Sequence, residues 1–168
     1  MKKFISLILS AILALGSFPA VLAAYTDADS SASYYESAIR LQDLGIINGY
    51  DDNTFRAGNQ ITRAEFTKIV ICMMDEDTAA KSSSATSSFY DVAQGSWFAP
   101  YVNYAVQKKI LSGYSDGSFV PDKTISYGEA LTILMRVLGY DETNVGYYWP
   151  DNYVTAATSL GITGDMNY

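Results

Sequence analysis

The feature that most limits how this chain can fold is an internal repeat with a constant offset of 64 residues. Residues 48–66 and 112–130 align without a gap, and identical residues recur at that offset, among them Gly49/Gly113, Tyr50/Tyr114, Phe55/Phe119, Ile61/Ile125 and Glu65/Glu129. A gap-free repeat is typical of folds in which one supersecondary unit stacks on copies of itself. The fold and the function are therefore expected to follow from what one such unit can do.

Each unit is predicted to consist of a helix, a short extended piece, a Gly-rich loop and a second helix, so the predicted fold class is mainly α. The first helices are expected at 33–45 and 99–109, where apolar residues recur on one face. The second helices begin with the spacing of a capping box, in which a hydroxyl and a carboxylate satisfy N–H groups at the helix start. These two pairs are Thr62/Glu65 and Ser126/Glu129.

A third unit is predicted to begin and to remain incomplete. Trp149 follows Trp97 by 52 residues and Ile162 follows Ile110 by the same interval, but the sequence ends before a third loop and capped helix. The Ser-rich stretch 76–88 has no apolar periodicity and is predicted to be a flexible linker. The expected organisation is a signal peptide (1–23), repeat 1 (24–75), the linker (76–88), repeat 2 (89–140) and a partial repeat 3 (141–168).

The first 23 residues have the pattern of a secretory signal peptide. Lys2 and Lys3 precede a short apolar run at 4–15, and small residues follow at 21–23. The apolar run is shorter than the roughly 20 residues that a membrane-spanning helix needs. The mature protein is therefore expected to be exported, with no membrane span after cleavage.

Charge and composition exclude several classes of function. The formal net charge is −7, and removal of Lys2 and Lys3 would leave 9 basic against 18 acidic residues, or −9. Such a chain lacks the basic face that nucleic acids or anionic membranes require. It has no histidine, and Cys72 is its only cysteine. No catalytic residue, metal site or cofactor is predicted, and a glycan hydrolase that uses paired carboxylates is the least favoured hypothesis.

Arg63 is the residue that helix capping does not explain. It occupies the first helical position after Thr62, where the helix dipole disfavours a cation. Arg63 is either a solvated surface residue or part of an anion site. In the second case its guanidinium would join the free N–H groups of the helix start in holding a carboxylate or phosphate.

Aromatic residues beside Gly-rich turns are candidates for lining a groove. Tyr50 and Tyr114 each follow a glycine of the repeated turn, and Trp97 precedes a predicted helix. Such rings either stack on sugar rings or fill the small cores of the repeats. The two alternatives are equally open for Tyr50, and a core position is favoured for Trp97.

Several motifs resemble the S-layer homology (SLH) family, and the resemblance covers residues 25–168. These motifs are Phe89-Tyr90-Asp91-Val92, Trp97-Phe98, the turn at 113–119 and Ile61-Thr62-Arg63-Ala64-Glu65. The resemblance implies SLH-type repeats packed around a shared helical bundle, with the third lobe truncated here. It also implies a non-catalytic module that anchors exported proteins to an anionic, often pyruvylated, secondary cell-wall polymer attached to peptidoglycan.

The resemblance further implies which residues bind the polymer. Arg63 would hold it in a groove between lobes, lined by the turns Gly49-Tyr50 and Gly113-Tyr114. Tyr127 stands where the motif of the second repeat would have its arginine, so the groove of that repeat is expected to bind weakly or to be structural only. The alternative function is a structural subunit that self-assembles on the surface through the incomplete third repeat.

Overall fold

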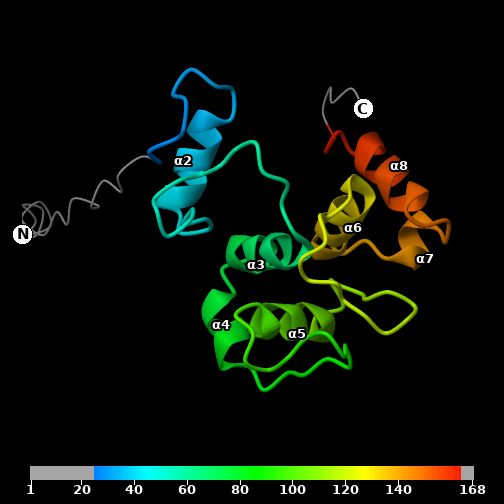
Figure 1. Cartoon of the computed structure of the whole chain (residues 1–168). Coiled ribbons are helices and arrows are strands. Elements are labelled where there is room, and N and C mark those ends of the chain that lie inside the picture. Colours follow the sequence, from blue (N-terminus) through cyan, green and yellow to red (C-terminus); the bar gives the residue numbers. More distant parts are fainter. Residues whose placement is uncertain (1–24, 164–168) are drawn as a thin grey trace, which may run out of the picture. The chain divides into compact units, whose positions relative to one another are not determined.

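The computed structural model describes residues 25–163, so the predicted signal peptide lies outside the described residues. Within 25–163 the chain has seven helices and no strand, which confirms the mainly α, SLH-type fold class (Figure 1). The chain divides into two compact units, which meet between Ala57 and Gly58 in the sequence. No helix within the described range combines the length and the apolarity that crossing a bilayer requires.

The first unit consists of one helix and a loop that is tied to the start of the described chain. Helix α2 (Tyr35–Asp43) lies within the predicted range 33–45. Asp27 accepts hydrogen bonds from the backbone N–H groups of Phe55 (2.6 Å) and Arg56 (2.8 Å). The ring of the buried Tyr25 stacks on Phe55 at 5.2 Å between centroids. These contacts close the loop on the start of the described chain, and Phe55 also stacks on Tyr34, the N-cap residue of α2, at 5.6 Å between centroids.

The loop of the second repeat repeats this closure at the same sequence offset. Asp91 accepts hydrogen bonds from the N–H groups of Phe119 (2.9 Å) and Val120 (2.7 Å). Phe89 stacks on Phe119 at 5.9 Å, as Tyr25 does on Phe55. The sequence repeat is therefore also a repeat of specific contacts.

The glycine that opens each loop is required because an aromatic ring and a carbonyl fill the space beside it. A Cβ on Gly113 would lie 2.1 Å from the ring of Phe89 and 2.6 Å from the Ser118 carbonyl oxygen. We expect Gly113→Ala to lower the free energy of unfolding by about 2 kcal/mol through overpacking. Gly58→Ala, where a Cβ would meet nothing within 4 Å, is the control and should leave stability nearly unchanged in urea denaturation. Equal stability of the two variants would contradict this account of the loop.

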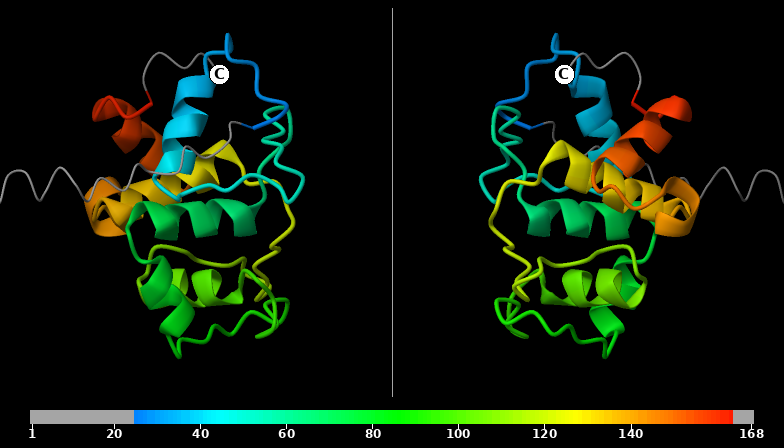
Figure 2. Two further views of the ribbon diagram at one scale, coloured as in Figure 1. Left: turned by 90° about the vertical axis from the view of Figure 1, so that its left-hand side faces the viewer. Right: turned by 90° about the vertical axis from the view of Figure 1, so that its right-hand side faces the viewer.

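The second unit contains the other six helices of the described chain. These are α3 (Arg63–Met73), α4 (Asp77–Ser82), α5 (Ala99–Gln107), α6 (Tyr127–Val137), α7 (Glu142–Val145) and α8 (Asp151–Ser159). Helix α3 packs against α4 and α5, and α8 packs against α6 and α7 (Figures 1 and 2). Helix α3 comes from the first sequence repeat but belongs to this unit, so the compact units do not follow the repeat boundaries.

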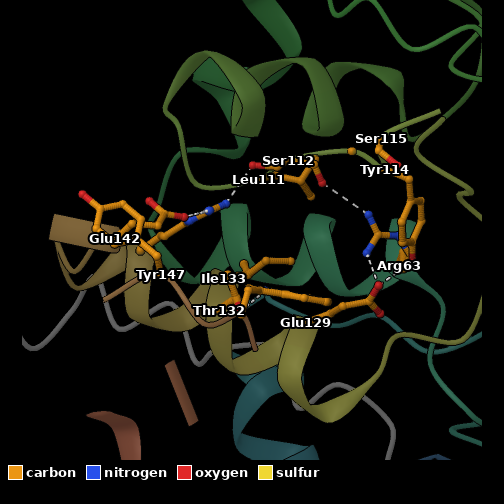
Figure 3. A pocket seen from close by; sticks show the side chains of 13 residues that line it. Arg63, Leu111, Ser112, Tyr114, Ser115, Glu129, Thr132, Ile133, Glu142 and Tyr147 are labelled. Carbon is orange, nitrogen blue, oxygen red and sulfur yellow. Dashed lines mark hydrogen bonds and ion pairs between the residues drawn. The ribbon is translucent and has the colours of Figure 1, made fainter. Parts of the chain in front are cut away.

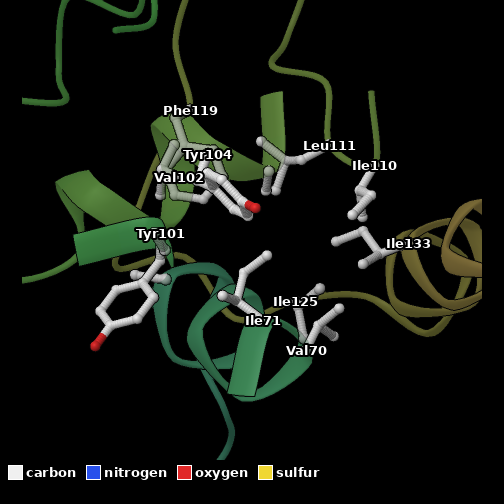
Figure 4. Close-up of a cluster of buried hydrophobic side chains, with 13 residues drawn as sticks. Val70, Ile71, Tyr101, Val102, Tyr104, Ile110, Leu111, Phe119, Ile125 and Ile133 are labelled. Atoms are coloured by element: carbon white, nitrogen blue, oxygen red, sulfur yellow. The ribbon is translucent and has the colours of Figure 1, made fainter. Parts of the chain in front are cut away.

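The main core of the second unit lies between helices that come from both repeats. Val70 and Ile71 of α3 face Val102 of α5, and Ile133 of α6 closes one side (Figure 4). Ile71 and Val102 have no exposed surface. Burial of such side chains contributes roughly 1.5–3 kcal/mol each, so α3 is fixed in place by the second repeat.

The stretch 76–88 differs from the predicted flexible linker. Residues Asp77–Ser82 form helix α4, and its Ala80 has no exposed surface against the core. The Tyr101 hydroxyl donates to Asp77 at 2.9 Å, and Lys81 pairs with Asp77 at 2.8 Å. The expectation of a wholly flexible linker was wrong because one buried alanine and one tyrosine from α5 supply contacts that periodicity does not reveal.

Candidate functional site

The starts of the two capped helices are bound to each other. Both capping boxes are present as predicted, at α3 and α6. Thr62 and Thr124 form an antiparallel bridge. The backbone N–H of Arg63 donates to Lys123 O at 2.9 Å, and that of Ala64 donates to Pro121 O at 3.0 Å. The hypothesis that free N–H groups at the start of α3 hold an anion was therefore wrong, because carbonyls of the second repeat already satisfy them.

The side chain of Arg63 is buried, with 4% of its surface exposed, so it is not a solvated surface arginine. Its Nε donates to Phe119 O at 2.8 Å and its Nη2 to Ser112 O at 3.5 Å. Its Nη1 lies 3.0 Å from Glu129 Oε1 in a buried ion pair (Figure 3). The guanidinium carbon lies 4.7 Å from the ring centroid of Tyr114. Arg63 of the first repeat therefore completes the loop of the second.

Glu129 is held as a carboxylate by the same contacts. Burial alone would raise its pKa. The hydrogen bonds from the Tyr114 hydroxyl and the Ser126 backbone, together with the charge of Arg63, outweigh burial and lower the pKa below its usual value. Glu129 is therefore a carboxylate at neutral pH.

A pocket of about 390 Å³ opens beside this ion pair. In Figure 3, Arg63 and Tyr114 lie at one end of the pocket, and Glu142 and Tyr147 lie at the other. Its lining comes from α3, from the second-repeat loop, from α6 and from the third partial repeat: Arg63, Leu111, Ser112, Gly113, Tyr114, Ser115, Glu129, Thr132, Ile133, Arg136, Glu142, Tyr147 and Trp149.

Arg136 of α6 is the second arginine of the pocket. Its Nη2 pairs with Glu142 at 2.5 Å, its Nη1 donates to the Ser112 hydroxyl at 2.9 Å, and its Nε donates to the Tyr153 hydroxyl at 3.2 Å. Burial opposes the charge of Arg136, but the contacts with Tyr153 and Glu142 outweigh it and raise the pKa. Arg136 is thus a fixed cation, since its three nitrogens are each anchored.

The pocket contains N–H groups that the protein itself does not use. Each guanidinium carries five N–H groups, and the contacts above leave one on each Nη nitrogen of Arg63 and Arg136. Among residues 25–163, the backbone N–H groups of Ser112, Gly113 and Ser115 donate no hydrogen bond to another backbone group. This arrangement can bind a carboxylate or another small anion through directed hydrogen bonds.

The structure brings together three of the residues that the sequence singled out, namely Arg63, Gly113 and Tyr114. Gly49 and Tyr50 lie in the first unit. The ring of Tyr50 is covered by Arg56, whose guanidinium carbon lies 4.0 Å from the ring centroid. Arg63 thus stacks on Tyr114, the tyrosine of the second repeat.

Trp97 lies outside the pocket and outside the core. Its side chain is 55% exposed, and its ring packs edge-to-face on Phe98 at 5.5 Å. The preference for a core position was therefore wrong, because the segment before α5 turns the indole outward.

Sequence reasoning missed Arg136, Thr132 and Trp149 as lining residues. Thr132 and Arg136 follow Glu129 by three and seven residues, which is the spacing of one helix face. That spacing could have placed both beside the capping glutamate. Trp149 could not be placed in this way, because it reaches the pocket only through the packing of α8 against α6.

Among residues 25–163, no three His, Cys, Asp or Glu side chains come close enough together to hold a metal ion. The Asp residues of the repeated loops have another role. Asp52 and Asp116 each accept the N–H and the hydroxyl of the residue two positions later, Thr54 and Ser118. Both segments are therefore Asx-type turns.

Comparison with known proteins gives matches within both repeats and over nearly the whole chain. The family model of the S-layer homology domain matches residues 24–67 and 88–131. A surface layer protein of Brevibacillus choshinensis is 33% identical over 99% of this chain and 15% of its own length. A middle cell wall protein of Brevibacillus brevis is 34% identical over 96% of this chain and 16% of its own length.

A third relative, a cellulosome-anchoring protein of Acetivibrio thermocellus, is 36% identical over 55% of this chain and 21% of its own length. The chain thus spans only about a sixth to a fifth of the length of these relatives. The matches fall on the two repeats whose loops and capped helices the structure shows to be equivalent. The chain belongs to the S-layer homology domain family.

Proposed function

We propose that this chain is a non-catalytic module that holds an exported protein at the bacterial cell wall. The ligand is an anionic, pyruvylated secondary cell-wall polysaccharide, bound in the pocket beside Arg63 and Arg136. S-layer homology domains anchor proteins to the cell wall, and one relative is named a cellulosome-anchoring protein. The observation that carries the proposal is the set of unused N–H groups around this pocket.

The charges of the pocket favour a single carboxylate over a dense polyanion. Arg63 and Arg136 are balanced by Glu129 and Glu142, so the attraction comes from directed hydrogen bonds and not from a net positive field. The whole chain is acidic, with a net charge of −7. A highly charged polymer such as a nucleic acid would be repelled, whereas a sugar with one pyruvate ketal presents one carboxylate to the N–H groups.

The size of the pocket points to a short stretch of the polymer. At about 390 Å³ it lies near the lower end of the range for small-molecule pockets, roughly 300–1,000 Å³. This space suits one modified sugar unit with part of a neighbour. Repeated weak contacts along a polymer would then add to the strength of attachment.

The proposal is tested with purified sacculi from the source bacterium, with and without the secondary polymer stripped by acid. Arg136→Gln should lower retention of the full chain about tenfold, because the anchored guanidinium is lost. Arg40→Gln, on the exposed side of α2, is the matched control and should bind like wild type. Equal retention on intact and stripped sacculi would refute the proposal.

A second candidate is a surface-layer subunit that assembles with copies of itself. Leu160 and Ile162, near the end of the described chain, are 50% and 40% exposed. Exposed apolar side chains of this kind favour self-association. The sacculus-binding assay repeated without sacculi tests this candidate, because a self-assembling subunit would sediment on its own. A module that only anchors would stay in solution there.

A further inference from the structure

Three consecutive aromatic side chains are exposed at the mouth of the pocket. Tyr147, Tyr148 and Trp149, here called the aromatic ledge, are 77%, 88% and 54% exposed. Tyr147 and Trp149 also line the pocket. Large aromatic side chains gain much free energy from burial, so a cluster of them left in solvent marks a contact surface.

The ledge is held firmly on helix α6. The indole N–H of Trp149 donates to the Thr132 hydroxyl at 2.9 Å. The Asn152 side chain donates to the Gly146 carbonyl at 2.6 Å, which ties the two ends of the segment together. Pro150 packs on Gly128 of α6, where a Cβ would lie 2.7 Å from the proline ring. The aromatic rings are therefore presented by an anchored turn.

The aromatic ledge extends the pocket at the end that lies opposite the buried Arg63. In Figure 3, Tyr147 lies at the end opposite Arg63, beside Glu142. A polysaccharide whose charged unit is held beside Arg63 and Arg136 would have to pass over these rings as it leaves the pocket. The indole N–H of Trp149 already donates to the Thr132 hydroxyl, so a ligand would contact the face of the Trp149 ring.

We propose that the aromatic ledge is a second subsite, on which an uncharged sugar ring of the same polymer stacks next to the pyruvylated unit. The inference rests on the proposed function and adds to it that recognition extends beyond the anionic group. Stacking of the flat apolar face of a sugar ring on an aromatic side chain contributes binding free energy without hydrogen bonds. The ledge would therefore distinguish a polysaccharide from a small carboxylate that enters the pocket alone.

Tryptophan fluorescence gives a direct test, since the chain has only two tryptophans. In Trp97→Phe, Trp149 is the only tryptophan that remains. Acid-released wall polysaccharide should shift its emission, whereas sodium pyruvate at the same carboxylate concentration should change it little. In Trp149→Phe, Trp97 should not respond to either ligand, because its indole packs on Phe98 outside the pocket. No response of Trp149 to the polysaccharide would overturn the inference.

Affinity measurements separate the ledge from the anion site. The double variant Tyr147→Ala/Tyr148→Ala should bind the released polysaccharide five- to tenfold more weakly and keep its weak binding of pyruvate. Tyr90→Ala, which removes a tyrosine that is 75% exposed and does not line the pocket, is the control.

Different outcomes identify which idea fails. If Arg136→Gln loses retention while the double variant binds like wild type, the ledge proposal is wrong and the proposed function stands. If wild-type protein binds neither polysaccharide nor intact sacculi, both are wrong. If the double variant loses pyruvate binding as well, the two substitutions have damaged the pocket itself. That outcome would also reject the proposal of a separate subsite.

Discussion

Glu129→Gln is expected to lower the free energy of unfolding by about 3 kcal/mol at pH 7. The substitution leaves the guanidinium of Arg63 buried without its charged partner, and removal of one member of a buried pair costs roughly 3–5 kcal/mol. It also replaces the carboxylate that accepts from the Tyr114 hydroxyl. Urea denaturation followed by tryptophan fluorescence measures the loss, and both tryptophans lie in the second unit.

The same substitution has a defined pH dependence. The pKa of Glu129 is lower in the folded protein than its ordinary value of 4.5, so the ionised form stabilises the fold. This stabilisation is complete above about pH 4.5 and is lost as the pH falls through the lower folded pKa. The difference in stability between wild type and Glu129→Gln should therefore be largest near pH 7 and shrink below about pH 4.5.

Glu65→Gln is the matched control. Glu65 occupies the same position in the first capping box and accepts the Thr62 N–H at 2.8 Å. Because it caps α3 without an arginine partner among the ion pairs of residues 25–163, its replacement should cost only about 1 kcal/mol. Equal losses in the two variants would show that Glu129 acts as a helix cap alone.

The parts of the fold that were predictable from the sequence are those fixed by near neighbours in the chain. A capping box needs only a hydroxyl and a carboxylate three residues apart, so Thr62/Glu65 and Ser126/Glu129 could be placed directly. The helices that follow them have an apolar face that is visible in the sequence. The equivalence of the two loops likewise followed from their constant offset.

The part of the site that could not be predicted depends on contacts between repeats. Nothing near Arg63 in the sequence shows that its guanidinium enters the loop of the next repeat, 49 to 56 residues away, at Ser112 and Phe119. For the same reason the contact between Arg63 and the ring of Tyr114 could not be foreseen. The helix-start N–H groups were taken as free because the bridge to Thr124 is equally remote in sequence.

Phe119→Ala is expected to cost about 4 kcal/mol of unfolding free energy. The side chain has no exposed surface, stacks on Phe89 and lies against the guanidinium of Arg63, with 4.8 Å between the guanidinium carbon and the ring centroid. Truncation of a buried phenylalanine removes its apolar burial and leaves a cavity, which typically costs 3–5 kcal/mol. The loss is measured by the same fluorescence-detected urea denaturation.

Two further substitutions show whether the ring itself matters. Phe119→Leu keeps most of the apolar volume and should cost about 1.5 kcal/mol or less. Tyr90→Ala, at a side chain that is 75% exposed, should change stability by less than about 0.5 kcal/mol. If alanine and leucine at position 119 were equally destabilising, the loss would come from the ring contacts with Phe89 and Arg63. If neither destabilised the protein, the loop of the second repeat would not be part of the core that positions Arg63.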